Sequence, residues 1–304
     1  MSLEGSFETV SPCVVGFISK LERTRVGERP IFPTIIGTGF LVDPSGIAVT
    51  NRHVVEAFDK IPPHPTTGEF PIAAFVFLQG DEGKSMQFLL LEVKKWFGLQ
   101  SFGSTGDWYG QTIPDIGFVQ LGVREVPFLR LSTHDFYVKV GMTISTVGYP
   151  MGTLPLTVMG KLNQMTPFLR QGIVSSVFPF PTAKPHGFTI DIMQQGGSSG
   201  SPIFTCGETA VIGMMSSSII DATPIQTSQG HFLVPQNTNI SIAESSHIVQ
   251  LALDEVRSQF PKQSDDVPTL QALREQYPQG PTSEGLQWDS LGRGDIFNKK
   301  PGGG

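Results

Sequence analysis

The stretch that decides the fold is GGSSGSPIF, residues 196–204. A serine hydroxyl becomes a useful nucleophile only beside a base, and acyl transfer also needs backbone N–H groups aimed at the developing oxyanion. Ser199 is therefore the candidate nucleophile, and the N–H groups of Gly197 and Ser199 are the candidate oxyanion hole. Glycine at position 197 lets the backbone bend without a Cβ clash, and Gly200 keeps the turn open. The simpler alternative is a small-residue turn between two strands.

Two upstream stretches supply the base and the acid that a hydrolytic serine needs. In GTGFLVDPSGIAVTNRHVV, residues 37–55, two apolar runs flank an Asp-Pro-Ser-Gly turn, and His53 follows the second run. This pattern predicts a β-hairpin that ends next to the base. In DIGFVQLG, residues 115–122, Asp115 opens an apolar strand. The chain order of histidine, aspartate and serine is that of the chymotrypsin fold and differs from that of subtilisins and α/β-hydrolases.

Four other carboxylates compete with Asp115 for the role of the acid. Asp43 lies in the hairpin turn, and the other three lie in loop-like sequence: Asp59, Asp81 and Asp107. A triad carboxylate must be sheltered from water, and Asp115 alone opens an apolar strand in the expected segment.

These motifs resemble those of the HtrA/Deg-like branch of the trypsin-like serine proteases. Sequences of that branch contain the motifs G-x-G-F, T-N-x-H-V-V, D-[IL]-A and G-N-S-G-G-P in this order. Three more stretches resemble family segments: VGYPMG at 147–152, QGIVSSVF at 171–178 and AVIGMMSSSI at 210–219. The resemblance runs from about residue 37 to residue 260. Ser198 and Ser201 depart from it, because the family usually places asparagine and glycine at these positions.

The resemblance implies an all-β fold of two six-stranded antiparallel barrels with a C-terminal helix. It implies an N-terminal barrel over 1–129 that carries the histidine and the aspartate, and a second barrel over 130–260 that carries the serine. Residues 261–304 are polar and are expected to form a mobile tail, too short for the PDZ domain that often follows such a protease domain. The long connection over 60–112 is expected to be a surface insertion.

By the same resemblance, His53 is the general base, Asp115 orients it, and Ser199 attacks a peptide carbonyl to form an acyl-enzyme. The chain is thus expected to be a serine endopeptidase. The alternative is a latent or non-catalytic module of the protease fold that binds peptides without cleaving them. The substrate backbone is expected to pair with a strand that contains Ser216, Ser217 and Ser218.

The residue at the base of the specificity pocket is expected to be Met193, where enzymes with basic preference carry an aspartate. Together with residues 232–234 it predicts an apolar pocket and a preference for small or medium aliphatic P1 residues.

Bulk composition agrees with a β-rich protein that acts on polypeptides. The formal net charge is −6 and only 16% of residues are charged, with no basic stripe, so nucleic acid is not an expected partner. We expect no metal and no cofactor. The two cysteines, Cys13 and Cys206, are too few for a disulfide-stapled secreted protease. No signal peptide or membrane span is visible, which favours a cytoplasmic location.

Overall fold

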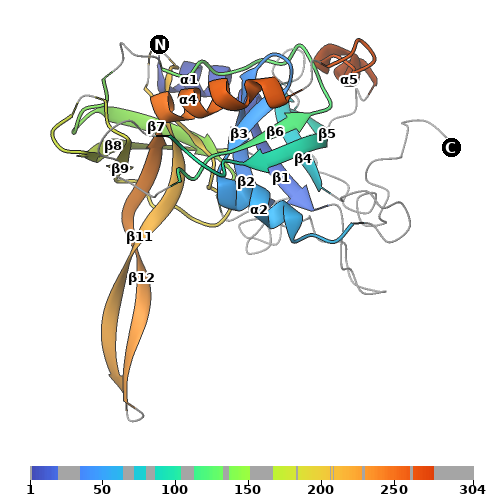
Figure 1. Ribbon diagram of the computed structural model, residues 1–304. Coiled ribbons are helices and arrows are strands. Elements are labelled where there is room, and N and C mark those ends of the chain that lie inside the picture. Colours follow the sequence, from blue (N-terminus) through green and yellow to red (C-terminus); the bar gives the residue numbers. More distant parts are fainter. Residues whose placement is uncertain are drawn as a thin grey trace.

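This computed structural model of the chain describes residues 2–19, 35–63, 72–79, 86–103, 113–132, 137–150, 167–182, 184–205, 207, 209–227, 230–260 and 263–276. Most of the described residues lie in two closed antiparallel barrels (Figure 1). The all-β architecture of two six-stranded barrels is therefore confirmed.

The first barrel has the strand order β1-β2-β3-β6-β5-β4 and closes where β1 pairs with β4. Its strands are β1 (Val14–Ser19), β2 (Ile35–Asp43), β3 (Ile47–Thr50), β4 (Ile72–Gln79), β5 (Met86–Gly98) and β6 (Gly117–Leu121). The predicted hairpin is β2–β3, and its turn contains Gly46 at φ 80°. An added Cβ at this glycine would lie 2.3 Å from the Val123 carbonyl oxygen, which explains why glycine stands there.

The second barrel repeats the plan with the order β10-β11-β12-β9-β8-β7. Its strands are β7 (Thr143–Gly148), β8 (Phe168–Phe178), β9 (Gly187–Ile190), β10 (Pro202–Phe204), β11 (Val211–Thr227) and β12 (Gly230–Ser245). The last two are much longer than the others and form a hairpin that leaves the barrel (Figure 1).

Helices cover the ends of the barrels. They are α1 (Leu3–Val10), η1 (Ser11–Cys13), α2 (Arg52–Asp59), α4 (Ser246–Val256), η3 (Arg257–Gln259) and α5 (Leu270–Gln276). The expected C-terminal helix is α4, which continues into η3. The first strand, β1, begins at Val14, because Pro12 lies in the short helix η1.

The described part of the predicted polar tail packs against the first barrel. The Leu270 side chain is buried, and its N–H donates to the Arg124 carbonyl oxygen at 2.9 Å. The Arg124 N–H in turn donates to the Pro268 carbonyl oxygen at 3.0 Å. Residues 263–276 therefore belong to the folded body, whereas the rest of the predicted tail lies outside the described residues.

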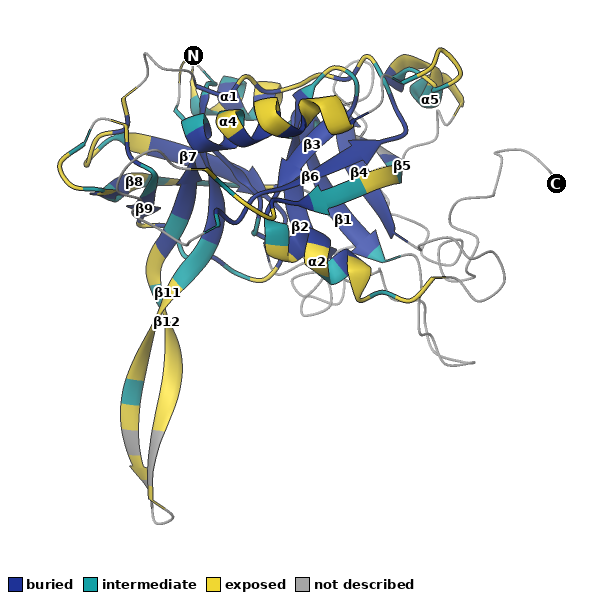
Figure 2. Cartoon of the chain, viewed as in Figure 1, coloured by how far each residue is buried: buried dark blue, intermediate teal, exposed yellow. Residues whose placement is uncertain are grey.

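Most strand segments of both barrels are buried (Figure 2), and aromatic packing joins the barrels at the core. Phe75 on β4 lies edge to face with Tyr149, the residue after β7, with ring centroids 4.7 Å apart. Phe77 contacts the Phe75 ring at 5.8 Å. All three side chains are buried, so the barrels share one apolar interior.

The Phe75→Ala variant tests this shared core. Phe75 is fully buried, so we expect the free energy of unfolding to fall by about 3–5 kcal/mol, through lost burial and a residual cavity. The measurement is urea unfolding followed by tryptophan fluorescence. The matched control is Phe128→Ala at a 40% exposed position, where the loss should stay below about 1 kcal/mol. Equal losses in the two variants would contradict this account of the core.

Candidate active site

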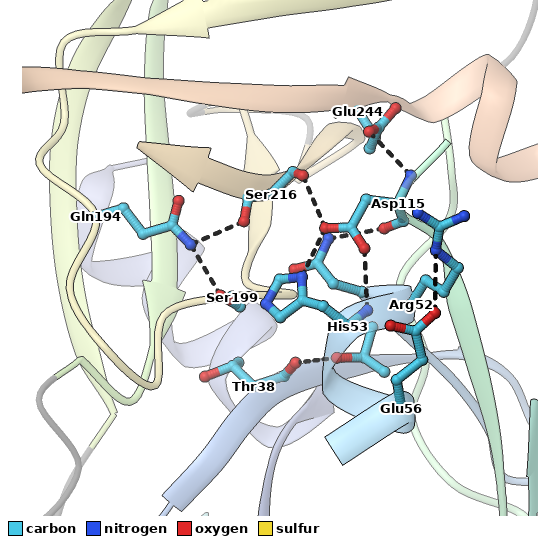
Figure 3. A network of polar contacts seen from close by, with 11 residues as sticks. Thr38, Arg52, His53, Glu56, Asp115, Gln194, Ser199, Ser216 and Glu244 are labelled. Carbon is cyan, nitrogen blue, oxygen red and sulfur yellow. Dashed lines mark hydrogen bonds and ion pairs between the residues drawn. The ribbon is translucent and has the colours of Figure 1, made fainter. Parts of the chain in front are cut away.

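Strand pairing brings His53 and Asp115 together. β3 pairs with β6 through Thr50 and Gly117, so the residues that follow β3 lie beside those that precede β6. His53 lies in the first turn of α2. Its Nδ1 lies 2.7 Å from Asp115 Oδ2, and its backbone N–H donates to Asp115 Oδ1 at 3.0 Å (Figure 3). The second bond fixes the carboxylate plane relative to the helix and therefore relative to the ring.

The Asp115 carboxylate is buried and is bonded from both barrels. The Ser216 hydroxyl on β11 donates to Asp115 Oδ2 at 3.0 Å. Burial alone would raise the pKa of Asp115, but the hydrogen bonds from His53 and Ser216 and the charge of His53 outweigh it. The pKa of Asp115 therefore lies below its usual value. This carboxylate stays ionised at neutral pH.

The nucleophile loop is a tight turn whose shape depends on glycine. The Ser198 N–H donates to the Gln195 carbonyl oxygen at 2.9 Å, and Gly197 in this turn has φ 91°. Gly200 has φ 88°, and a Cβ there would lie 2.0 Å from the Thr38 carbonyl oxygen. Both glycines have a positive φ, which side chains with a Cβ rarely adopt, so the loop needs glycine at these two positions. Ser199 itself is half-buried.

Thr38 on β2 holds the loop from the other barrel. Its hydroxyl donates to the Gly197 carbonyl oxygen at 2.6 Å and accepts from the Tyr149 N–H at 3.1 Å. Its backbone N–H donates to the Ser199 carbonyl oxygen at 2.8 Å. These two bonds fix the peptide group between Gly197 and Ser198 and the peptide group between Ser199 and Gly200.

The two N–H groups of the candidate oxyanion hole are free of protein acceptors. In the described part of the chain, neither the Gly197 nor the Ser199 N–H donates a hydrogen bond. The hydrogen bond between Ser198 and Gln195 closes a four-residue turn. Gly197 is the third residue of this turn and has a positive φ, so the turn is of type II. The geometry leaves these donors available to an incoming oxyanion.

Gln194 connects the nucleophile to the β11 strand. Its Nε2 donates to Ser199 Oγ at 2.9 Å and to the Ser216 carbonyl oxygen at 2.9 Å (Figure 3). The side chain is only 9% exposed, and within the described residues its Oε1 is buried without a hydrogen-bond partner. A buried amide oxygen without a partner costs free energy, so this side chain gains from a donor brought by a ligand.

Glu244 on β12 is a second buried carboxylate beside Asp115. Its Oε1 accepts the Asp115 N–H at 3.1 Å, while the Asn51 side chain donates to the Asp115 carbonyl oxygen at 2.9 Å. Burial, opposed by that hydrogen bond but reinforced by the Asp115 charge, raises the pKa of Glu244 to about 7; the Arg52 charge acts in the lowering direction. Glu244 thus ties the backbone of the first barrel to a strand of the second.

The residues predicted to bind substrate are buried or half-buried. Ser216 is buried on β11, and Ser217 and Ser218 follow it half-buried. Met193 is half-buried, and its carbonyl oxygen accepts from Arg170.

Leu233 and Val234, by contrast, were wrongly assigned to the apolar pocket. Leu233 is 70% exposed and Val234 is 38% exposed, because β12 carries them away from the barrel. The side chain of Phe232, the third residue of that assignment, lies outside the described part of the structure.

Three residues of this network were not singled out from the sequence: Thr38, Gln194 and Glu244. Thr38 and Gln194 lie inside or next to the quoted motifs, so their closeness to these motifs could have marked them as site residues. Glu244 lies 129 positions from its partner Asp115 and has no local signal. Among the described residues, no group of three or more histidine, cysteine or carboxylate side chains is placed to hold a metal ion. None of the described helices has the length and hydropathy needed to cross a bilayer.

Glu244→Gln tests the buried carboxylate through the pH dependence of stability. The pKa of Glu244 is about 7 in the folded protein and about 4.5 in the unfolded chain. The unfolded chain therefore loses its proton first, and the folded protein loses stability as pH rises from about 4.5 to about 7. Glutamine keeps the acceptor for the Asp115 N–H and carries no charge. We expect the variant to match or fall below wild type at pH 4.5 and to be more stable by up to about 3 kcal/mol at pH 8.

The measurement is the thermal midpoint at a series of pH values. Glu255→Gln, at an exposed position on α4, is the control and should show no such trend. A stability difference for Glu244→Gln that does not change between pH 4.5 and pH 8 would contradict the raised pKa.

A family model described as a trypsin-like peptidase domain matches residues 37–214. The HtrA-type protease AlgW with a tripeptide is a structural neighbour at 14% identity and a TM-score of 0.48, with 85% of this chain covered and 63% of that chain. The serine endoprotease from Yersinia pestis is another, at 14% identity and a TM-score of 0.46, with 85% and 66% covered.

This chain therefore spans a little under two thirds of the length of these neighbours. No curated protein sequence matches it. The family model covers more than half of the chain and includes all the motifs from the β2–β3 hairpin to the nucleophile loop. The chain belongs to the trypsin-like peptidase family.

Proposed function

We propose that the protein is a serine endopeptidase that cleaves peptide bonds through an acyl-enzyme, with Ser199 as nucleophile, His53 as general base and Asp115 as orienting acid. The observation that carries the proposal is one connected polar network. It runs from the His53 ring through Asp115 and Ser216 to Gln194 and Ser199 (Figure 3).

The chemistry follows from the roles of these groups. Ser199 Oγ attacks the carbonyl carbon while His53 Nε2 takes the hydroxyl proton, and the same proton later goes to the leaving amine. Asp115 Oδ2 accepts from His53 Nδ1, which fixes the tautomer that leaves Nε2 free to accept the proton. The ionised state of Asp115 stabilises the imidazolium that forms. Water then attacks the acyl-enzyme by the reverse sequence of proton transfers.

The Gly197 and Ser199 N–H groups are proposed to bind the oxyanion. Their support is the shape of the loop. The Gly197 N–H belongs to the central peptide group of the turn that the Ser198 N–H closes on the Gln195 carbonyl oxygen. The Ser199 N–H belongs to the peptide group whose carbonyl oxygen, that of Ser198, accepts the Ser201 N–H at 3.0 Å. Each preorganised donor of this kind is worth about 3–4 kcal/mol in the transition state.

We propose a small or medium aliphatic P1 residue. Gln194 bridges Ser199 Oγ and the Ser216 carbonyl oxygen, and neither it nor the neighbouring Met193 carries a negative charge. A lysine or arginine at P1 would find no anionic partner among these residues.

A latent enzyme is the second candidate, and Gln194 is the specific observation in its favour. The hydrogen bond from Gln194 occupies one of the two lone pairs of Ser199 Oγ and lowers its nucleophilicity. The same side chain occupies the Ser216 carbonyl oxygen, which the substrate backbone needs. The described conformation is thus a resting state in which Gln194 must turn away before substrate binds.

Active-site labelling tests the proposed triad. Wild type is expected to react with a fluorophosphonate, as read by intact mass, because its serine is activated. Ser199→Ala should show no adduct, and His53→Ala should label at least about 1,000-fold more slowly. Labelling of Ser199→Ala, or equal rates for wild type and His53→Ala, would refute the assignment. If wild type does not react with the fluorophosphonate and Gln194→Ala does, the protein is a latent enzyme that Gln194 holds inactive.

The role of Gln194 at the pocket is tested by a P1 peptide library. Wild type should favour alanine and valine at P1 over lysine and arginine. Gln194→Ala should raise kcat/KM for leucine and phenylalanine at least about tenfold, since the vacated volume admits them and the nucleophile is released. Gln195→Ala is the neighbouring control and should keep the wild-type profile. A wild-type preference for arginine would overturn the pocket, as would an unchanged profile in Gln194→Ala.

A further inference from the structure

A carboxylate that the proposed reaction does not use lies next to the triad. Glu244, near the end of β12, is only 9% exposed, and its Oε1 accepts the Asp115 N–H at 3.1 Å (Figure 3). The side-chain carboxylate of Asp115 is bonded to His53 and to Ser216. A residue of the second barrel therefore contacts the backbone of the residue that orients the base.

The charged groups around Glu244 are mostly negative. The charges that act on it are those of Asp115, from the segment before β6, and Arg52, from α2. Arg52 is shared with Glu56, whose Oε1 lies 3.5 Å from the Arg52 Nε. Ionised Glu244 therefore adds a third negative charge to a cluster that holds one guanidinium.

The other elements packed against this part of β12 supply no counter-charge. β11 and β9 place Met214 and Gly187 opposite Glu244. Among the described residues, neither His186, just before β9, nor His247, on α4, acts on the pKa of this carboxylate. Its charge state therefore depends on the groups of α2 and of the triad.

A hydrogen bond alone does not require a carboxylate at this position. The carbonyl oxygen of a glutamine side chain would accept the same N–H without a charge. Burial and the Asp115 charge raise the pKa of Glu244 to about 7, so the carboxylate destabilises the fold when it ionises. Titratable groups with strongly shifted pKa values gather at functional sites. The charge of Glu244 is thus the property that needs a function.

We propose that Glu244 is a positioning residue for the triad: it holds the Asp115 backbone from the second barrel, and its negative charge favours the imidazolium that forms on His53. This inference rests on the proposed function. When His53 takes the proton of the Ser199 hydroxyl, a positive charge forms on the ring beside Asp115. A second carboxylate on the far side of Asp115 stabilises that charge without touching the substrate.

The sign of the pH dependence follows from the two charge states of Glu244. Well below its pKa of about 7, at about pH 5, the side chain is protonated and contributes only the hydrogen bond to Asp115. As pH rises through about 7, the carboxylate ionises and the imidazolium of His53 becomes easier to form. Glutamine cannot make this change. The advantage of glutamate over glutamine is therefore expected at high pH and is absent at low pH.

The test is the second-order rate constant for reaction with a fluorophosphonate, read by intact mass at about pH 5 and about pH 8.5. We expect wild type and Glu244→Gln to react equally at the lower pH. At the higher pH the variant should react at least about threefold more slowly, because it lacks the charge. Glu255→Gln, at an exposed position on α4, is the matched control and should follow wild type throughout.

Two results overturn the role of the charge. One is a loss in Glu244→Gln that is the same at both pH values, which a purely structural role would produce. The other is the absence of any loss at the higher pH. If wild type reacts only after Gln194→Ala releases the nucleophile, the same comparison is made in the Gln194→Ala background.

Glu244→Ala separates position from charge, because it removes the acceptor as well. The Asp115 N–H is then buried without a partner, so the reaction should slow at least about tenfold even at the lower pH. Glu244→Gln keeps the wild-type rate there. An alanine variant that matches wild type at the lower pH would show that the hydrogen bond positions nothing. If the alanine variant does not fold, the Glu244→Gln comparison decides the proposal.

NMR titration of the His53 ring distinguishes failure of this proposal from failure of the proposed function. It is recorded on the full-length Ser199→Ala protein, so it needs no catalysis. Adding Glu244→Gln should lower the midpoint of the titration by about half a pH unit or more, since the imidazolium loses a stabilising charge.

The two measurements together assign each failure. If the midpoint shifts but neither wild type nor Gln194→Ala reacts with the fluorophosphonate, Glu244 acts on His53 and the proposed enzyme function is wrong. If the protein reacts, the midpoint stays in place and the two rates agree at both pH values, the enzyme assignment stands and Glu244 has no part in it.

Discussion

The buried carboxylate of Asp115 is the constraint on which the rest of the site depends. An ionised group out of water must be bonded on all sides, because an unpaired buried charge costs several kcal/mol. His53 bonds it from the first barrel and Ser216 from the second, while Glu244 and Asn51 fix its backbone. The two barrels can satisfy these groups in only one relative position. The same position seats the nucleophile loop against Thr38.

The resulting site is held in shape on one side and occupied on the other. The turn from Gln195 to Ser198 and the bond from the Ser201 N–H to the Ser198 carbonyl oxygen fix the peptide groups that carry the Gly197 and Ser199 N–H. Gln194, by contrast, donates to both the Ser199 hydroxyl oxygen and the Ser216 carbonyl oxygen. One side chain therefore bonds the candidate nucleophile and the strand beside it.

The long β11–β12 hairpin follows from how β11 is used twice. Residues 211–214 close the barrel against β10, and the next residues leave one edge open where Ser216 meets Asp115. Extending this strand beyond the barrel does not disturb the barrel, since only β12 accompanies it.

The sequence by itself determined the elements that depend on local chemistry. The β2–β3 hairpin, the glycine-dependent nucleophile turn and the helix α4 were all readable, because turn residues and apolar periodicity act over a few positions. His53, Asp115 and Ser199 were identified because each stands in a recognisable local motif. Only the tertiary structure decided the bonds from Ser216, Glu244 and Asn51 to Asp115, the position of Gln194 and the length of the β11–β12 hairpin. These depend on contacts between distant segments, such as Thr38 with Gly197 across 159 positions, which no local pattern specifies.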